Sequence, residues 1–169
     1  MPELPAEFRR ILALLTEAKI DFVVVGGLAM VLLGTDTVTG DVDISFALDE
    51  PNREKLATAV RHLNPRLLGF NPTAGFELTA ARLARVRFLN LTTDLGQIDL
   101  LPLPSGLDSY EGLKARSMEL DMDEFTVRVA SIDDLIAMKR AAGRVKDQAH
   151  LLELQALKRL LAEGLESDD

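Results

Sequence analysis

Residues 41–46, Asp-Val-Asp-Ile-Ser-Phe, place two acidic residues one residue apart inside a mostly apolar stretch. Because side chains two apart in a β-strand point to the same side, Asp41 and Asp43 would project together while Val42 and Ile44 face a core. Two carboxylates held this close repel each other unless a cation lies between them. The segment therefore predicts a strand with one face in the hydrophobic core and the other at a cation-binding site.

The residues before this strand predict a second strand that passes directly into a short helix. Residues 20–25 are rich in β-branched side chains and predict a buried strand, which ends at Gly26 and Gly27. Residues 28–33 form an apolar helix too short to be stable alone, so it has to pack on the sheet, and residues 35–40 form a loop. The Gly pair has two interpretations: a tight turn with no other role, or a place where a ligand approaches the backbone.

A third acid, Asp99, lies between Ile98 and Leu100 in another predicted strand. A charge in the middle of an apolar strand is costly unless something pairs with it. If strand 97–101 lies beside strand 41–46, all three acids converge on one face, and an oxygen-only site of this kind suits Mg²⁺ or Mn²⁺. The alternative is that the acids are exposed on an edge strand, with Asp99 at a strand end next to a glycine turn.

The order of the predicted elements indicates an α+β (α/β) fold with a mixed β-sheet, flanking helices and a C-terminal helical segment. Further helices are expected at residues 5–18, 51–63, 110–115, 131–143 and 147–161, and further strands at 86–91, 118–122 and 125–129. The length predicts a single domain over residues 1–169, with a core over about residues 20–130 and C-terminal helices over about 131–164.

The composition excludes several classes of function. There are 19 Lys and Arg against 27 Asp and Glu, a net charge of −8, which disfavours non-specific binding of duplex DNA but permits RNA or nucleotide at a local cationic patch. The absence of Cys excludes disulfides, Cys-based zinc sites and a thiol nucleophile. The longest apolar stretch, residues 22–33, is about half of a membrane span, and charges interrupt the N-terminus. We therefore expect a cytoplasmic protein without a membrane partner.

The Gly pair, the Asp-x-Asp strand and the later acid together resemble the nucleotidyltransferase superfamily of the DNA polymerase β type, in its minimal bacterial branch. The residues that carry this resemblance are Gly26, Gly27, Asp41, Asp43 and Asp99. Residues 133–154, DDLIAMKRAAGRVKDQAHLLEL, are also similar to the branch that includes AbiEii-type and MenT-type toxins of toxin–antitoxin pairs. The resemblance covers roughly residues 20–155.

The resemblance implies transfer of a nucleoside monophosphate from an NTP to a hydroxyl of RNA (such as tRNA), protein or a small molecule. In this scheme Asp41 and Asp43 hold Mg²⁺ (or Mn²⁺) against the triphosphate, and Asp99 completes a second metal site or accepts a proton. The residues implied in nucleotide binding are Gly26, Gly27, Thr39, Lys139, Arg144, Lys146 and Asp147. Simpler roles are open for two of them: a solvated helix end for Lys139, and the N-cap of the last helix for Asp147.

One position departs from the family pattern. Relatives often carry Arg two residues before the loop Thr, and here that position is Thr37, ahead of Thr39. A phosphate-facing cation is therefore missing from the loop. This departure favours one alternative, a weak or inactive nucleotidyltransferase fold that binds nucleotide or a partner protein. A toxin that pairs with a cognate antitoxin is a biological role compatible with either activity or binding alone. The isolated His62 and His150 are expected to lie on the surface or to pack between helices.

Overall fold

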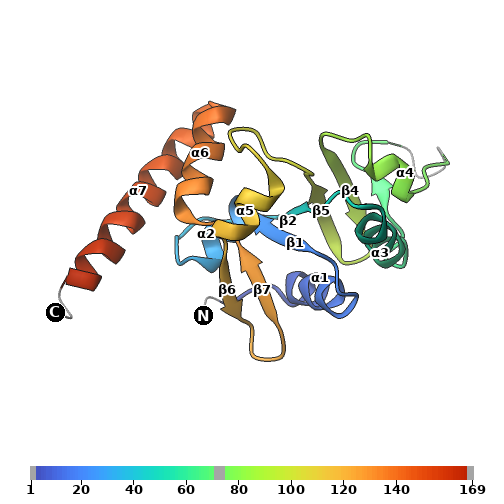
Figure 1. Ribbon diagram of the computed structural model, residues 1–169, viewed down its shortest axis with the longest axis horizontal. Helices are drawn as coiled ribbons and strands as arrows, with labels where there is room; N and C mark the ends of the chain where they lie inside the picture. The colour runs from blue at the N-terminus through green and yellow to red at the C-terminus, as the bar shows by residue number, and fades with distance from the viewer. Residues whose placement is uncertain (1–2, 71–74, 167–169) are drawn as a thin grey trace.

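The computed structural model describes residues 3–70 and 75–166, and within these ranges a seven-stranded mixed sheet is flanked by helices (Figure 1). The strands are β1 (Phe22–Val25), β2 (Asp41–Phe46), β3 (Arg66–Leu67), β4 (Leu89–Thr93), β5 (Gly96–Leu100), β6 (Met118–Asp121) and β7 (Thr126–Val129). The helices are α1 (Ala6–Glu17), α2 (Gly26–Leu32), α3 (Glu50–Arg61), α4 (Ala80–Leu83), α5 (Tyr110–Arg116), α6 (Ile132–Ala142) and α7 (Val145–Glu166). The predicted fold class is confirmed.

The strand order is β3-β4-β5-β2-β1-β7-β6. β2 lies at the centre, antiparallel to β1 and parallel to β5, as the convergence of the three acids required. β4 and β5 form a hairpin, and β6 and β7 form a second one that joins β1 in parallel through β7. The sheet therefore mixes parallel and antiparallel pairs.

The two faces of β2 differ as its alternating sequence predicts. Val42 and Ile44 are fully buried in a hydrophobic core that they share with Ile11 and Leu15 of α1. This core anchors the strand, because burial of aliphatic side chains is the main favourable contribution to folding. The acidic side chains of β2 project from the opposite face, which is therefore held at a fixed position by the core beneath it.

Side chains cap two of the helices, α3 and α6. Asp49 caps α3 by accepting a hydrogen bond from the Asn52 N–H at 3.0 Å, and Ser131 caps α6 by accepting one from the Asp134 N–H at 3.1 Å. Gly143 ends α6 in the left-handed conformation, with φ 62°. A sharp turn after α6 therefore brings α7 back against it.

Several predicted boundaries are wrong. α2 begins at Gly26 rather than at residue 28, and α7 begins at Val145 rather than at residue 147. β4 begins at Leu89 rather than at residue 86, and the two-residue strand β3 was not predicted at all. Strand ends depend on where the partner strand ends, so the apolar pattern before β4 extends beyond the part that pairs.

α6 and α7 lie at one end of the molecule and α3 and α4 at the other, with α7 extending away from the sheet (Figure 1). None of the helices in the described ranges combines the length and the apolar character that crossing a bilayer requires.

Candidate active site

Asp41, Asp43 and Asp99 come together on the face of the sheet opposite the core. The register places Asp43 of β2 beside Asp99 of β5, and one carboxylate oxygen from each of the three acids lies within 4.8 Å of the others. Asp99 is buried, at 6% exposure. Neighbouring strands carry the acids at a spacing set by the sheet, so the cluster is built into rigid elements.

The three carboxylates repel one another when no cation lies between them. Burial is the largest cause that raises the pKa of Asp43, to about 8, and the negative charges of Asp41 and Asp99 raise it further. A hydrogen bond from the Gly27 backbone acts in the opposite direction, because it favours the ionised carboxylate. Burial and the neighbouring Asp99 also raise the pKa of Asp41. Within the described part of the chain, none of the three carboxylates forms a salt bridge. An oxygen-only donor set with uncompensated negative charge fits a divalent cation such as Mg²⁺ or Mn²⁺.

Gly26 and Gly27 allow α2 to begin directly against the acids. Gly26 has φ 65°, and a Cβ at this position would overlap Oδ2 of Asp43. A Cβ on Gly27 would lie 3.0 Å from Oγ1 of Thr39. The Gly pair is therefore more than a tight turn, because the close approach of Gly26 to Asp43 leaves no room for a larger residue.

Gly26→Ala is expected to lower activity on the order of 100-fold by displacing Asp43, since a shift of about 1 Å in a catalytic group can cost that much. The left-handed conformation should also reduce the free energy of unfolding by about 1–2 kcal/mol. Activity assays and urea unfolding measure the two effects. Gly40→Ala is the matched control, because a Cβ on Gly40 would meet no atom within 4 Å. Equal activity of the two variants would contradict the prediction.

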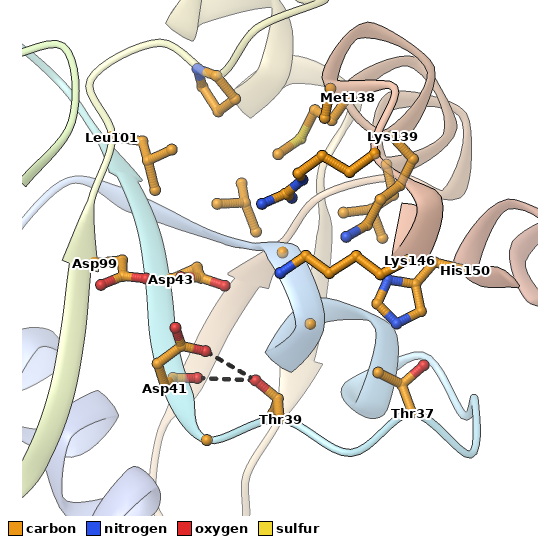
Figure 2. A pocket seen from close by; sticks show the side chains of 18 of the residues that line it. Thr37, Thr39, Asp41, Asp43, Asp99, Leu101, Met138, Lys139, Lys146 and His150 are labelled. Atoms are coloured by element: carbon orange, nitrogen blue, oxygen red, sulfur yellow. Dashed lines mark hydrogen bonds between the residues drawn. The ribbon is translucent and has the colours of Figure 1, made fainter. Parts of the chain in front are cut away.

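Lys139, Arg144 and Lys146 face the acids across a cavity of about 680 Å³. All three cations come from the corner where α6 turns into α7. In Figure 2 Lys139 and Lys146 extend toward the acidic side of the cavity. The charges of the two walls influence each other. Lys146 partly opposes the rise in the pKa of Asp41 that burial and Asp99 cause, and the charge of Asp43 adds to the larger effect of Asp147 in raising the pKa of Arg144. We call the three carboxylates the acidic wall and the three cationic side chains the basic wall. Such opposed walls suit a ligand that brings a divalent cation to the acidic wall and phosphates to the basic wall.

Asp147 lies behind the basic wall rather than in the cavity lining. Its carboxylate is 1% exposed and accepts hydrogen bonds from Arg144 Nε at 2.8 Å, from the Arg144 backbone N–H at 3.0 Å and from Lys139 Nζ at 3.3 Å. These contacts lower the pKa of Asp147, with the Arg144 side chain as the largest cause. Asp147 sits in the first turn of α7 and bonds back to the residue before the helix, so it is not the N-cap. It orients Lys139, which is 11% exposed.

Asp147→Asn is expected to reduce the free energy of unfolding by about 2 kcal/mol, because it removes charge-assisted hydrogen bonds and leaves Lys139 without its partner. Affinity for a nucleotide, the ligand that the resemblance implies for Lys139 and Arg144, should fall by about tenfold as the two side chains lose their fixed positions. Urea unfolding and nucleotide titration measure these changes. Asp133→Asn is the control, because it breaks only the exposed Lys158–Asp133 pair and should change stability by less than about 0.5 kcal/mol. A similar result for both variants would contradict the role given to Asp147.

The loop between α2 and β2 closes one side of the cavity. Thr39 Oγ1 donates a hydrogen bond to Oδ1 of Asp41 at 3.0 Å and so orients this carboxylate. Thr37, at the position where relatives often carry Arg, donates instead to Oε2 of Glu153 on α7 at 2.9 Å. The loop therefore supplies no cation and is tied to the helix that carries Lys146.

Three residues that the sequence analysis did not assign to the site also line the cavity: Asn90, Gln97 and His150. Asn90 Nδ2 donates to Oδ1 of Asp99 at 2.7 Å, and Gln97 Nε2 donates to the same oxygen at 3.4 Å. His150, expected on the surface or in helix packing, has a buried Nδ1 without a hydrogen-bond partner among the described residues. The sequence could have indicated this position of His150, because His150 follows Lys146 by four residues and the two therefore lie on the same side of α7.

Two solved structures share the fold of this chain. LnuA, a lincosamide antibiotic adenylyltransferase solved with lincomycin bound, has a TM-score of 0.64 and 15% identity over 93% of this chain and 99% of its own. ANT(2")-Ia, solved with adenylyl-2"-tobramycin, has a TM-score of 0.56 and 18% identity over 94% of this chain and 90% of its own. At these identities the two structures show a shared fold.

A search of curated proteins found no match. A family model matches residues 3–167, nearly the whole sequence, and is described as "Nucleotidyltransferase of unknown function (DUF6036)". The resemblance to nucleotidyltransferases is thereby confirmed at the level of the superfamily, while the toxin branch stays a prediction. The chain belongs to the DUF6036 family of nucleotidyltransferases.

Proposed function

We propose that this protein transfers a nucleoside monophosphate from an NTP to a hydroxyl acceptor, with a divalent cation held by Asp41, Asp43 and Asp99. The observation that carries the proposal is the cavity itself. Three carboxylates within 4.8 Å of one another face three cationic side chains in a member of a nucleotidyltransferase family. A cation with a polyphosphate matches both walls.

A divalent cation bound to the acids would neutralise phosphate oxygens and polarise the phosphoryl group. Lys139, Arg144 and Lys146 bind the β- and γ-phosphates and stabilise the charge that develops on the leaving pyrophosphate. The acceptor oxygen forms a bond to the α-phosphorus as the bond to the β-phosphate oxygen breaks. Asp99, which Asn90 and Gln97 hold in place, receives the proton of the attacking hydroxyl.

The Gly pair contributes space rather than charge. Because neither Gly26 nor Gly27 has a Cβ, the backbone at the start of α2 is open to the nucleotide beside Asp43. Thr39 keeps the Asp41 carboxylate oriented, and Asp147 keeps Lys139 and Arg144 extended. Together these contacts preorganise both walls before a ligand arrives.

The toxin role and the cytoplasmic location stay predictions from the sequence. For a toxin, expression should arrest growth, and a neighbouring gene product should relieve the arrest. The names of two structural neighbours mention adenylyl transfer and antibiotics. These names support ATP as the substrate, and they support a small-molecule acceptor no less than RNA or protein.

The proposal is tested by incubating the protein with Mg²⁺ and each α-³²P-labelled NTP in turn. Total RNA, protein or hydroxylated small molecules are added as acceptors. We expect a labelled product and one pyrophosphate per transfer, and no product when EDTA removes the metal. The inactive binding module predicts a different result: nucleotide and Mg²⁺ raise the melting temperature, yet neither labelled product nor pyrophosphate forms.

A further inference from the structure

An uncharged surface continues the acidic face of the sheet in one direction. Asn90 and Asp99 are partners in the β4–β5 register, and Leu89 is the partner of Leu100. Phe88 directly precedes β4 and Leu101 directly follows β5, so the same register sets them opposite each other. Because alternate residues share a face, both lie on the side of Asn90 and Asp99, and both line the cavity. The Phe88 ring is 55% exposed.

The loop between β5 and α5 and the adjoining part of α6 complete this surface with Pro104 and Met138. Gly106 packs the loop tightly on α6, because a Cβ there would lie 2.6 Å from the carbonyl oxygen of Ala137. In Figure 2 Leu101 lies above Asp99, and Met138 lies across the cavity beside Lys139. We call Phe88, Leu101, Pro104 and Met138 the apolar wall.

The hairpin part of the apolar wall, Phe88 and Leu101, lies away from the cations, whereas Met138 directly precedes Lys139 on α6. In the described cavity lining, Lys139, Arg144 and Lys146 come from the α6–α7 corner, whereas Phe88 and Leu101 extend from the β4–β5 hairpin. In Figure 2 Asp99 and Leu101 lie on one side of the cavity and the two labelled lysines on the other. An attacking oxygen enters opposite the leaving pyrophosphate, because phosphoryl transfer proceeds in line. With the pyrophosphate at the basic wall, the acceptor approaches from the side of Asp99 and the apolar wall.

This side of the cavity is unsuited to a phosphodiester. A nucleic-acid acceptor would bring further negative charge next to the acids. The apolar wall contains no cationic side chain that could neutralise this charge. Arg85 and Arg87 precede Phe88 but are not among the residues that line the cavity. A half-exposed aromatic ring instead offers a flat surface on which a ring of the acceptor packs.

We infer that the acceptor is a small ring-bearing alcohol, uncharged or cationic, whose ring packs on Phe88 and Leu101 while its hydroxyl reaches Asp99. The inference rests on the proposed nucleotidyl transfer and narrows its acceptor. The acceptor hydroxyl loses its proton to Asp99 and gains the nucleotidyl group, and pyrophosphate leaves.

The test measures label transfer from α-³²P-ATP with Mg²⁺ to two kinds of probe: ring-bearing alcohols, including lincomycin and tobramycin, and total tRNA with free 3′-hydroxyls. Wild type is compared with Phe88→Ala, with Phe88→Tyr, which keeps the ring, and with Phe70→Ala, which removes an exposed ring outside the cavity lining. We expect a ring-bearing alcohol to be labelled. Phe88→Ala should raise its KM by about tenfold and leave the KM for ATP within about twofold. Phe88→Tyr should raise the KM for the acceptor less than Phe88→Ala does, and Phe70→Ala should resemble wild type.

Labelling of tRNA but of no ring-bearing alcohol would overturn the inference, and so would a Phe88→Ala effect on the KM for ATP instead of the acceptor. In both cases label transfer itself proceeds, so the proposed function stands. Absence of labelled product and of pyrophosphate release with every probe would instead reject the proposed function, and the inference with it.

Discussion

Asp43→Asn is expected to lower the rate of nucleotidyl transfer on the order of 10³-fold, the scale of losing a group that stabilises charge in the transition state. Asp43 is the central acid, beside Asp99 in the register and hydrogen-bonded to the Gly27 backbone. Asparagine has nearly the same size but no charge, so the cavity keeps its shape while the acidic wall loses a third of its carboxylates. The measurement is kcat/KM for pyrophosphate release at saturating Mg²⁺.

Asp36→Asn is the control for this substitution, because Asp36 is an exposed residue of the same loop–strand segment and outside the cavity lining. Its activity should stay within about twofold of wild type, as expected for a surface change away from the site. If Asp43→Asn retains more than about a tenth of the activity, a carboxylate-bound cation is not central to the reaction.

The part of the acidic wall that β2 supplies could be predicted because its pattern is local. The alternation of acids and aliphatics in residues 41–44 places the acids on one face of any strand, whatever its neighbours. Asn90 was within reach by the same means. In a hairpin that pairs Thr93 with Gly96, the residues three positions further from the turn on each strand are Asn90 and Asp99, so they lie opposite each other. The position of the turn is therefore enough to predict that Asn90 is a neighbour of Asp99.

The basic wall depends on tertiary structure. Lys139 and Lys146 are far from Asp43 in the sequence and reach the cavity only because α6 ends at Gly143 and α7 folds back on it. The role of Thr37 was equally hidden, since its hydrogen bond to Glu153 joins residues 116 positions apart. Periodicity and spacing describe single elements, and neither indicates which elements meet.

Three carboxylates held this close together destabilise the folded state when no cation lies between them. Burial and two neighbouring acids favour the protonated form of Asp43, with a pKa of about 8 in the folded state. In the unfolded chain the same carboxyl ionises near its ordinary value of about 4. Between these two values the folded state binds more protons than the unfolded state, so rising pH favours unfolding.

The metal-free protein should therefore lose stability as pH rises from 5 to 8, by on the order of 2–4 kcal/mol. Urea unfolding of EDTA-treated protein at several pH values measures this loss. Asp43→Asn should flatten the dependence and be more stable than wild type at pH 8, whereas Asp36→Asn should follow wild type. Mg²⁺ should restore wild-type stability at pH 8, because a ligand that binds only the folded state stabilises it, and should do less for Asp43→Asn. A wild-type protein whose stability ignores both pH and Mg²⁺ would show that the three acids do not share a cation site.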